Sequence, residues 1–348
     1  MWATSFEQPD ANFLVEHFLP SVVGTRFSPS NVADERALFI GDLATRLEAL
    51  RDRLTVIASA SRSDEEDLAY PWLWRFVGRF MVGAQSRAVQ HAKIWAFHWR
   101  VDHKEYIELH VSSTNLTSSA FKSQIQAGWQ VRLELGSRAS QRARQTWGGL
   151  IKFLEALGAS AGDVATSRVQ RLLDLLGRAE CPDGITFIAS IPGEKNAARA
   201  LRRFNPTELQ VLTPTIGNWN HQTLRAWGKD LGISPERIHL NWISEEHQWA
   251  QSQGWTLSTA TLRELERMGV RLRILPVDAR VADEHRDADH RWSHAKLYLL
   301  RCGRKRRLMV TAATWSIAAG GAGKVAAQNV ELGVLFDIDW AELESSGE

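Results

Sequence analysis

Apolar and polar residues alternate in several short stretches of the chain, and this period of two predicts β-strands. The clearest alternation follows two copies of a His-Ala-Lys triplet, as Ile94-Trp95-Ala96-Phe97 and Leu297-Tyr298-Leu299-Leu300. Other predicted strands lie at 54–59, 107–111, 130–135, 186–190, 209–213 and 271–276. Helical spacing of apolar residues predicts helices at 11–19, 33–52, 194–204, 222–231 and 259–268 and a helix-rich region at 140–178, whereas 236–256 is expected to be irregular. Strands that alternate with helices indicate an α/β fold.

The order of these elements repeats after about 200 residues. His91-Ala92-Lys93 and His294-Ala295-Lys296 are each followed by an apolar run and then by a segment rich in Ser and Thr, at 111–117 and 310–316. Each copy then continues with a strand that starts at a polar residue, Gln130 in the first copy and Glu331 in the second. Three elements repeated in one order indicate an internal duplication. The break at Cys181-Pro182-Asp183-Gly184 predicts two halves, 1–180 and 181–348.

The two triplets predict one shared site. Residues i and i+2 of a strand lie on the same face, so the His and the Lys of each triplet point the same way. A single His-x-Lys is a weak signal, and a surface strand with two polar side chains explains it equally well. Two copies are better explained by a site in which His91, Lys93, His294 and Lys296 meet across a seam between the halves.

This pattern resembles the phospholipase D superfamily, whose motif is His-x-Lys, a later Asp, and then Gly-Ser-x-x-Asn or a close variant. The Asp is missing from both copies, where His98 and Arg301 stand five residues after the Lys. The same departure is typical of the tyrosyl-DNA phosphodiesterase branch, to which the segments 186–193, 212–217 and 329–336 are also similar. The resemblance implies two pseudo-two-fold-related α/β/α sandwich halves of phospholipase D type with one site at the seam.

The resemblance also implies a role for each residue of the site. His91 would attack phosphorus and form a phosphohistidine, and His294 would protonate the leaving oxygen and later activate water. Lys93, Lys296 and Asn115 would hold the phosphoryl oxygens, while Gln130 and Glu331 would orient the imidazoles. The implied substrate-binding residues are Ser113, Thr213, Thr215, Thr311, Thr314 and Trp315. These side chains supply a nucleophile, charge stabilisation and an acid, so neither a metal nor a cofactor is expected.

One departure from the family pattern leaves the activity open. Thr314 stands where the second Asn is expected, and Ala312 stands where a Ser is expected. A threonine donates one hydrogen bond and reaches less far than asparagine, so reduced activity, a changed substrate or lost activity all remain possible. The expected function is a metal-independent phosphodiesterase on nucleic acid, with DNA as the expected substrate and end processing as the expected reaction. The alternatives are an endonuclease in restriction or defence and a weakened nucleic-acid-binding module.

Composition and charge change this picture little. The 348 residues are 44% apolar and 24% charged, as is usual for a soluble globular protein, and the net charge is only +2. Five of the seven residues 301–307 are positively charged, which fits either a solvated hairpin turn or a rim that faces a polyanion. Most of the 15 Trp are expected in the core, with Trp95, Trp292 or Trp315 as alternatives for base stacking at a cleft.

The remaining signals bear on compartment and partners. Cys181 and Cys302 form no disulfide framework and no metal-binding spacing. The acidic stretch 283–290 holds potential metal ligands but is interpreted as a surface loop. No signal peptide or membrane-spanning run is recognisable, so we expect a cytoplasmic protein without a membrane partner. Since both triplets lie in one chain, a monomer would suffice for a complete site.

Overall fold

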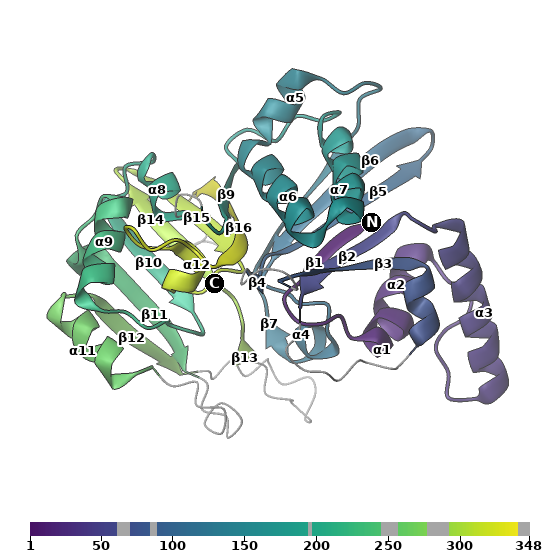
Figure 1. The fold of residues 1–348 in the computed structure, drawn as a ribbon, viewed down its shortest axis with the longest axis horizontal. Coiled ribbons are helices and arrows are strands. Elements are labelled where there is room, and N and C mark those ends of the chain that lie inside the picture. The colour runs from purple at the N-terminus through teal and green to yellow at the C-terminus, as the bar shows by residue number, and fades with distance from the viewer. Residues whose placement is uncertain (61–69, 84–88, 194–196, 245–256, 277–291, 340–348) are drawn as a thin grey trace.

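The chain folds into two β-sheets with helices on their faces (Figure 1). This computed structural model describes residues 1–60, 70–83, 89–193, 197–244, 257–276 and 292–339. No helix among these residues is long and apolar enough to cross a membrane.

The first sheet has six strands in the order β3-β2-β1-β5-β6-β8. The strands are β1 (Trp2–Ser5), β2 (Leu54–Ser59), β3 (Val77–Val82), β5 (Lys93–Val101), β6 (Lys104–Ser112) and β8 (Gly128–Glu134). Strands β1, β2 and β3 run parallel to one another, and β5, β6 and β8 pair antiparallel.

The second sheet has eight strands, seven of them in the order β12-β11-β10-β14-β15-β16-β4, with β9 also paired to β16. The strands are β4 (Val89–Gln90), β9 (Thr186–Ser190), β10 (Glu208–Thr213), β11 (Ile238–Ser244), β12 (Arg271–Pro276), β14 (Leu297–Cys302), β15 (Lys305–Thr311) and β16 (Asn329–Ile338). Two short strands, β7 (Gln124–Ile125) and β13 (Trp292–Ser293), pair with each other and link the two parts of the chain.

The two sheets match strand by strand. The order β3-β2-β1-β5-β6-β8 corresponds to β12-β11-β10-β14-β15-β16, and in both sheets the first three strands are parallel and the others antiparallel. The predicted α/β fold with two related halves is therefore confirmed. The boundary at 180/181 stays a prediction, and β4 precedes it in sequence but pairs with β16 of the second sheet.

Helices pack against both faces of the first sheet and against the second. The helices α1 (Ala11–Phe13), η1 (Leu14–Phe18), α2 (Leu19–Val23) and α3 (Ala33–Ala49) share one hydrophobic cluster with β1 and β2. On the other face, α6 (Gly148–Ala161) and α7 (Asp163–Leu176) share a cluster with β5, β6 and β16, so this core joins the two sheets. The second sheet buries α8 (Ala197–Arg202), α9 (His221–Leu231) and α11 (Thr259–Arg267). The shorter helices are η2 (Pro71–Arg75), α4 (Ser118–Lys122), α5 (Gln141–Thr146), η3 (Pro235–Arg237) and α12 (Ile317–Gly320).

Strands β1 and β11 are among those that the pattern did not predict. Strand β1 lies between β2 and β5, although it contains Thr4 and Ser5. The Thr4 hydroxyl donates to the carbonyl of Ala92 at 2.7 Å, so neighbouring strands satisfy its polar group. The expectation of an irregular 236–256 was wrong for 238–244, because β11 is paired along both edges by β10 and β12. In both cases strand pairing outweighs a weak local pattern.

The basic segment 301–307 forms the hairpin between β14 and β15, and Gly303 supplies the left-handed backbone of its turn with φ of 64°. Strand β14 is six residues long, so the turn lies about 20 Å from Lys296 at the strand's other end. Lys305 and Arg307 form ion pairs with Asp337 at 3.3 and 2.9 Å. The segment is therefore a hairpin turn away from Lys296, and a role as a rim that faces a polyanion stays a prediction.

Candidate active site

The two triplets occupy equivalent places at the beginning of β5 and β14. Lys93 is the first residue of β5, and Lys296 directly precedes β14. Each lysine folds back on its own triplet, since Lys93 Nζ donates to the carbonyl of His91 at 2.8 Å and Lys296 Nζ to that of His294 at 2.9 Å. Both lysines are 1% exposed. The duplication therefore extends to side-chain geometry.

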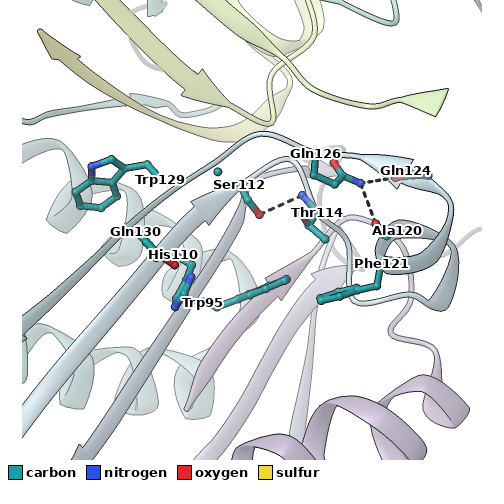
Figure 2. Close-up of a pocket in the computed structure, with 11 residues that line it drawn as sticks. Trp95, His110, Ser112, Thr114, Ala120, Phe121, Gln124, Gln126, Trp129 and Gln130 are labelled. Carbon is teal, nitrogen blue, oxygen red and sulfur yellow. Dashed lines mark hydrogen bonds between the residues drawn. The ribbon is translucent and has the colours of Figure 1, made fainter. Parts of the chain in front are cut away.

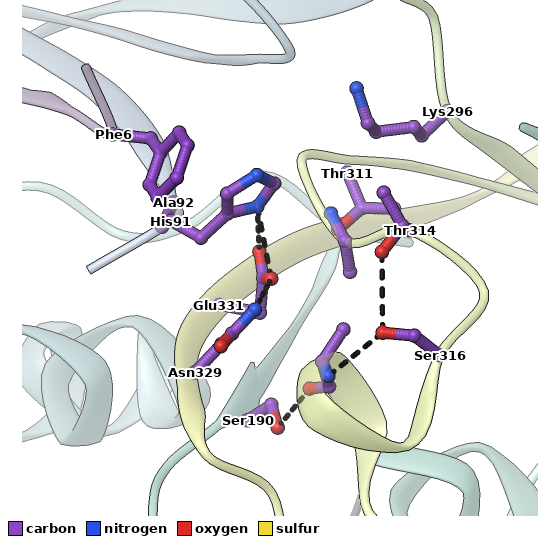
Figure 3. Close-up of polar contacts among 12 residues, drawn as sticks. Phe6, His91, Ala92, Ser190, Lys296, Thr311, Thr314, Ser316, Asn329 and Glu331 are labelled. Carbon is purple, nitrogen blue, oxygen red and sulfur yellow. Dashed lines mark hydrogen bonds and ion pairs between the residues drawn. The ribbon is translucent and has the colours of Figure 1, made fainter. Parts of the chain in front are cut away.

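His91 is held by the second sheet. The backbone N–H groups of His91 and Ala92 donate to the carbonyl of Val330 at 3.0 and 3.1 Å. The Nδ1 of His91 lies 3.0 Å from Oε1 and 3.1 Å from Oε2 of Glu331, below the ring in Figure 3. Asn329 donates to the same carboxylate at 3.1 Å. Because a carboxylate accepts, the proton of His91 resides on Nδ1, and Nε2 is left unprotonated.

His294 is held by residues of the first half, next to the first sheet, in the corresponding way. Its backbone N–H donates to the carbonyl of Ile125 at 2.9 Å. Its Nδ1 donates to the carbonyl of Ser113 at 3.1 Å and lies 3.3 Å from Oε1 of Gln126. These acceptors keep the proton on Nδ1 and direct Nε2 to the opposite side of the ring. Each half of the molecule therefore orients the histidine of the other half.

The four basic side chains influence one another's charge. Burial lowers the pKa of His91. The charge of Glu331 raises this pKa, and the charges of Lys93 and Lys296 lower it. Burial also lowers the pKa of His294 well below its ordinary value, and the charges of Lys296, Lys93 and His91 lower it further. Burial lowers the pKa of Lys93 to about 8. The structure thus brings the predicted quartet together at the seam, where an anion would offset the crowded positive charge. The catalytic roles of the four residues stay predictions.

Asn115 and Phe6 complete the His91 side of the site. Asn115 is 2% exposed, and its Oδ1 accepts the backbone N–H of Phe6 at 3.1 Å. The ring of Phe6 meets the imidazole of His91 edge-on at 4.7 Å between centroids, as Figure 3 shows. The ammonium of Lys93 lies 5.5 Å from the centroid of the same ring. Nothing in the sequence pattern singled out Phe6, because it follows a strand that was itself not predicted.

The glutamine next to Nδ1 of His294 is Gln126 and not Gln130, so the prediction for Gln130 was wrong. Strand pairing aligns Gly128 with Ser112 and Gly333 with Thr311, which makes the two glycines equivalent. Gln126 and Glu331 each lie two residues before their glycine. Gln130 instead pairs with His110 on β6. Counting back from the glycines, rather than forward from the first polar residue of the strand, would have found Gln126.

Four of the six predicted substrate-binding residues divide into two groups. Ser113 and Thr314 lie at the site: the carbonyl of Ser113 accepts from His294, and the hydroxyl of Thr314 donates to Ser316 at 3.2 Å (Figure 3). The hydroxyls of Thr213 and Thr311 are buried and bonded within the fold, to the carbonyls of Thr215 and Leu332 at 2.8 and 3.0 Å. These two threonines shape the loops around the site.

The prediction that Trp315 contacts substrate was wrong. Trp315 is 1% exposed and stacks on Trp219 with ring centroids 4.4 Å apart, within the core of the second sheet. The side chain of Trp292 and the acidic stretch 283–290 lie outside the described residues. Within the described ranges, no three His, Cys, Asp or Glu residues cluster as a metal site would require.

Comparison with known proteins bears on the fold. No family model matches the sequence, and no curated protein matches it. The structure is similar to that of yeast tyrosyl-DNA phosphodiesterase, with a TM-score of 0.58 and 14% identity, over 97% of this chain and 82% of the yeast chain. A yeast variant with a substituted histidine gives a TM-score of 0.60 at 15% identity, over 97% and 82% of the two chains. The chain therefore shares its fold with tyrosyl-DNA phosphodiesterase, as the resemblance in the sequence implied.

Proposed function

We propose that this chain is a phosphodiesterase that acts on nucleic acid through a covalent phosphohistidine. One observation carries the proposal. Two imidazoles from different halves have their Nδ1 atoms held by hydrogen-bond acceptors, at a seam that also holds two buried lysines. A phosphodiester needs a nucleophile, cations for its oxygens and an acid for its leaving group. The quartet supplies all three.

The geometry suits a two-step reaction. In the first step Nε2 of His91 attacks phosphorus and the bond to the leaving oxygen breaks. His294, which gains a second proton on Nε2 when the phosphate anion binds beside it, gives this proton to the leaving oxygen. In the second step His294 takes a proton from water, the water oxygen bonds to phosphorus, and the P–N bond to His91 breaks. Lys93 and Lys296 hold the phosphoryl oxygens throughout, and Glu331 stabilises the positive charge that His91 acquires.

The substrate is proposed to be DNA, and the reaction the removal of an adduct from a strand end. The shared fold with tyrosyl-DNA phosphodiesterase supports this choice. The test is a screen of DNA and RNA substrates in EDTA, run beside His91→Ala. Release of a 3′-adduct from single-stranded DNA is the expected result, whereas internal cleavage of plasmid would indicate the endonuclease alternative.

A weakened binding module is the second candidate, and Thr314 favours it. The hydroxyl of Thr314 donates to Ser316, so the second half has a shorter, already bonded side chain where the first half has Asn115. This candidate predicts that the protein binds nucleic acid without turnover and that His91→Ala leaves the affinity unchanged. That result would contradict the phosphodiesterase proposal.

The variant His294→Asn is expected to accumulate a protein–substrate adduct. Without the imidazole, nothing at this position can activate water, so the phosphohistidine forms with a good leaving group and then persists. Gel electrophoresis without acid, with a labelled substrate, measures the adduct. The matched control is His294→Asn combined with His91→Ala, which must show none. Absence of adduct in the single variant, with active wild type, would contradict the two-step route.

The pH dependence of turnover is expected to reflect Lys93. Its pKa is about 8, so the charge that holds the anionic substrate is present below this pH and is lost as the pH rises through it. We expect kcat/KM for bis(p-nitrophenyl) phosphate, which does not titrate in this range, to fall above about pH 8. A constant kcat/KM up to pH 10 would show that Lys93 does not titrate in the free protein.

A further inference from the structure

A pocket opens on the face of the first sheet that carries Trp95, beside the seam (Figure 2). Its volume is about 400 Å³. Trp95 and His110 from β5 and β6 form its floor, and Phe121, Gln124 and Gln126 from the segment of α4 and β7 form its wall. No role in the proposed reaction involves this space.

The side chains that line the pocket favour an uncharged, planar ligand. None of the eleven lining residues is Lys, Arg, Asp or Glu, and His110 is already paired with Glu108 at 2.8 Å, so the pocket offers no unpaired cation to a phosphate. Trp95 and Phe121 stack at 5.5 Å between centroids with 8° between their planes. Three glutamines, Gln124, Gln126 and Gln130, add amide groups, which match the hydrogen-bonding edges of a base. Aromatic faces with amide groups are the combination that binds unpaired nucleobases.

The pocket adjoins the site through shared residues. Gln126 lines the pocket and also lies 3.3 Å from Nδ1 of His294. Ser112 and Thr114, which line the pocket as well, flank Ser113, whose carbonyl accepts from the same nitrogen. The pocket and the positive seam thus share the groups that hold His294. This arrangement is complementary to a nucleotide, which has an anionic phosphate and an uncharged base.

We infer that this pocket binds a nucleobase of the strand whose phosphate lies at the seam. The inference rests on the proposed function for the position of the phosphate, but base binding itself requires no turnover. The pocket would therefore make the protein prefer strands with an unpaired base near the reacting phosphate, since a base within a duplex is stacked and not accessible.

The test compares two labelled hexanucleotides, one of thymidines and one of abasic residues, which carry the same phosphates. Fluorescence anisotropy with the full chain is expected to give about tenfold tighter binding of the thymidine strand. The variant Phe121→Ala should reduce this ratio several-fold, and Trp95→Leu should do the same. Phe27→Ala is the matched control, because Phe27 is 42% exposed and Phe121 43%, and Phe27 does not line the pocket.

Two results would overturn the inference. One is equal affinity of the wild type for the two strands, and the other is an unchanged ratio in Phe121→Ala. If the thymidine preference is absent but an aromatic dipeptide amide binds and is lost in Phe121→Ala, the pocket takes a peptide side chain and the base assignment is wrong. Hydrolysis of bis(p-nitrophenyl) phosphate, which has no base, is measured separately, so failure of the proposed function remains distinguishable.

Discussion

Alanine at position 91 is expected to lower the rate of phosphodiester hydrolysis by about 10⁴-fold or more. The substitution removes the nucleophile, and the proposed reaction has no other route to a covalent intermediate. It also leaves the carboxylate of Glu331, which is 2% exposed, without its imidazole partner. A buried acceptor that loses a partner costs about 1–3 kcal/mol of stability, so thermal unfolding must accompany the rate measurement to show that the variant is folded at the assay temperature.

His98→Ala is the matched control for this experiment. His98 lies further along β5, the strand that begins at Lys93, and its side chain is 35% exposed and 3.9 Å from Glu105. Its replacement should leave the rate within about twofold of the wild type, as is usual for surface substitutions. If His91→Ala retained a rate within tenfold of the wild type, the histidine would not be the nucleophile.

Methionine at position 93 is expected to abolish turnover and to stabilise the fold. Lys93 is buried, and burial lowers its pKa from the ordinary 10.5 to about 8. At about 1.4 kcal/mol per pKa unit, this difference corresponds to about 3 kcal/mol by which folding disfavours the charged form. Methionine has a similar length and no charge, so it removes this cost but loses the bond from Nζ to the carbonyl of His91. We expect a gain of about 2 kcal/mol and a higher Tm at pH 7.

The gain in stability from Lys93→Met is expected to depend on pH. The folded protein releases the proton of Lys93 at about pH 8, whereas the unfolded chain holds it until about pH 10.5. The cost of the buried charge is therefore full below pH 8 and declines as the pH rises toward 10.5. The stabilisation by Lys93→Met should shrink over this window.

Lys104→Met, at a lysine whose side chain is 57% exposed, is the control for Lys93→Met and should change stability by less than about 0.5 kcal/mol. A lower Tm for Lys93→Met than for the wild type would show that the contacts of Lys93 with Phe6 and His91 outweigh the cost of burying its charge.

The sequence predicted the repeated part of the molecule well, for a physical reason. Strands buried on one face must alternate, and a duplicated site must repeat its chemistry, so both signals are visible without a structure. These signals located the four residues of the quartet, and the family resemblance implied the role of Glu331. The α/β fold followed from the order of the same elements.

The residues that the sequence missed or misassigned depend on pairing and packing. Gln126 is placed by the register of β8 against β6, which local pattern does not determine. Trp315 follows a Ser/Thr-rich turn and looked accessible, but stacking on Trp219 buries it. Phe6 reaches His91 only because β1 is inserted between β2 and β5. Each of these contacts joins segments that are distant in sequence.

The backbone bonds from His91 and Ala92 to Val330 have a consequence for assembly. His91 precedes the predicted boundary between the halves, yet its main chain is tied to β16, the last described strand. A fragment ending near residue 180 would carry the imidazole of His91 on a segment with an open edge. Co-expression of two separate fragments should therefore restore the site only when they associate, which makes the molecule suited to fragment complementation.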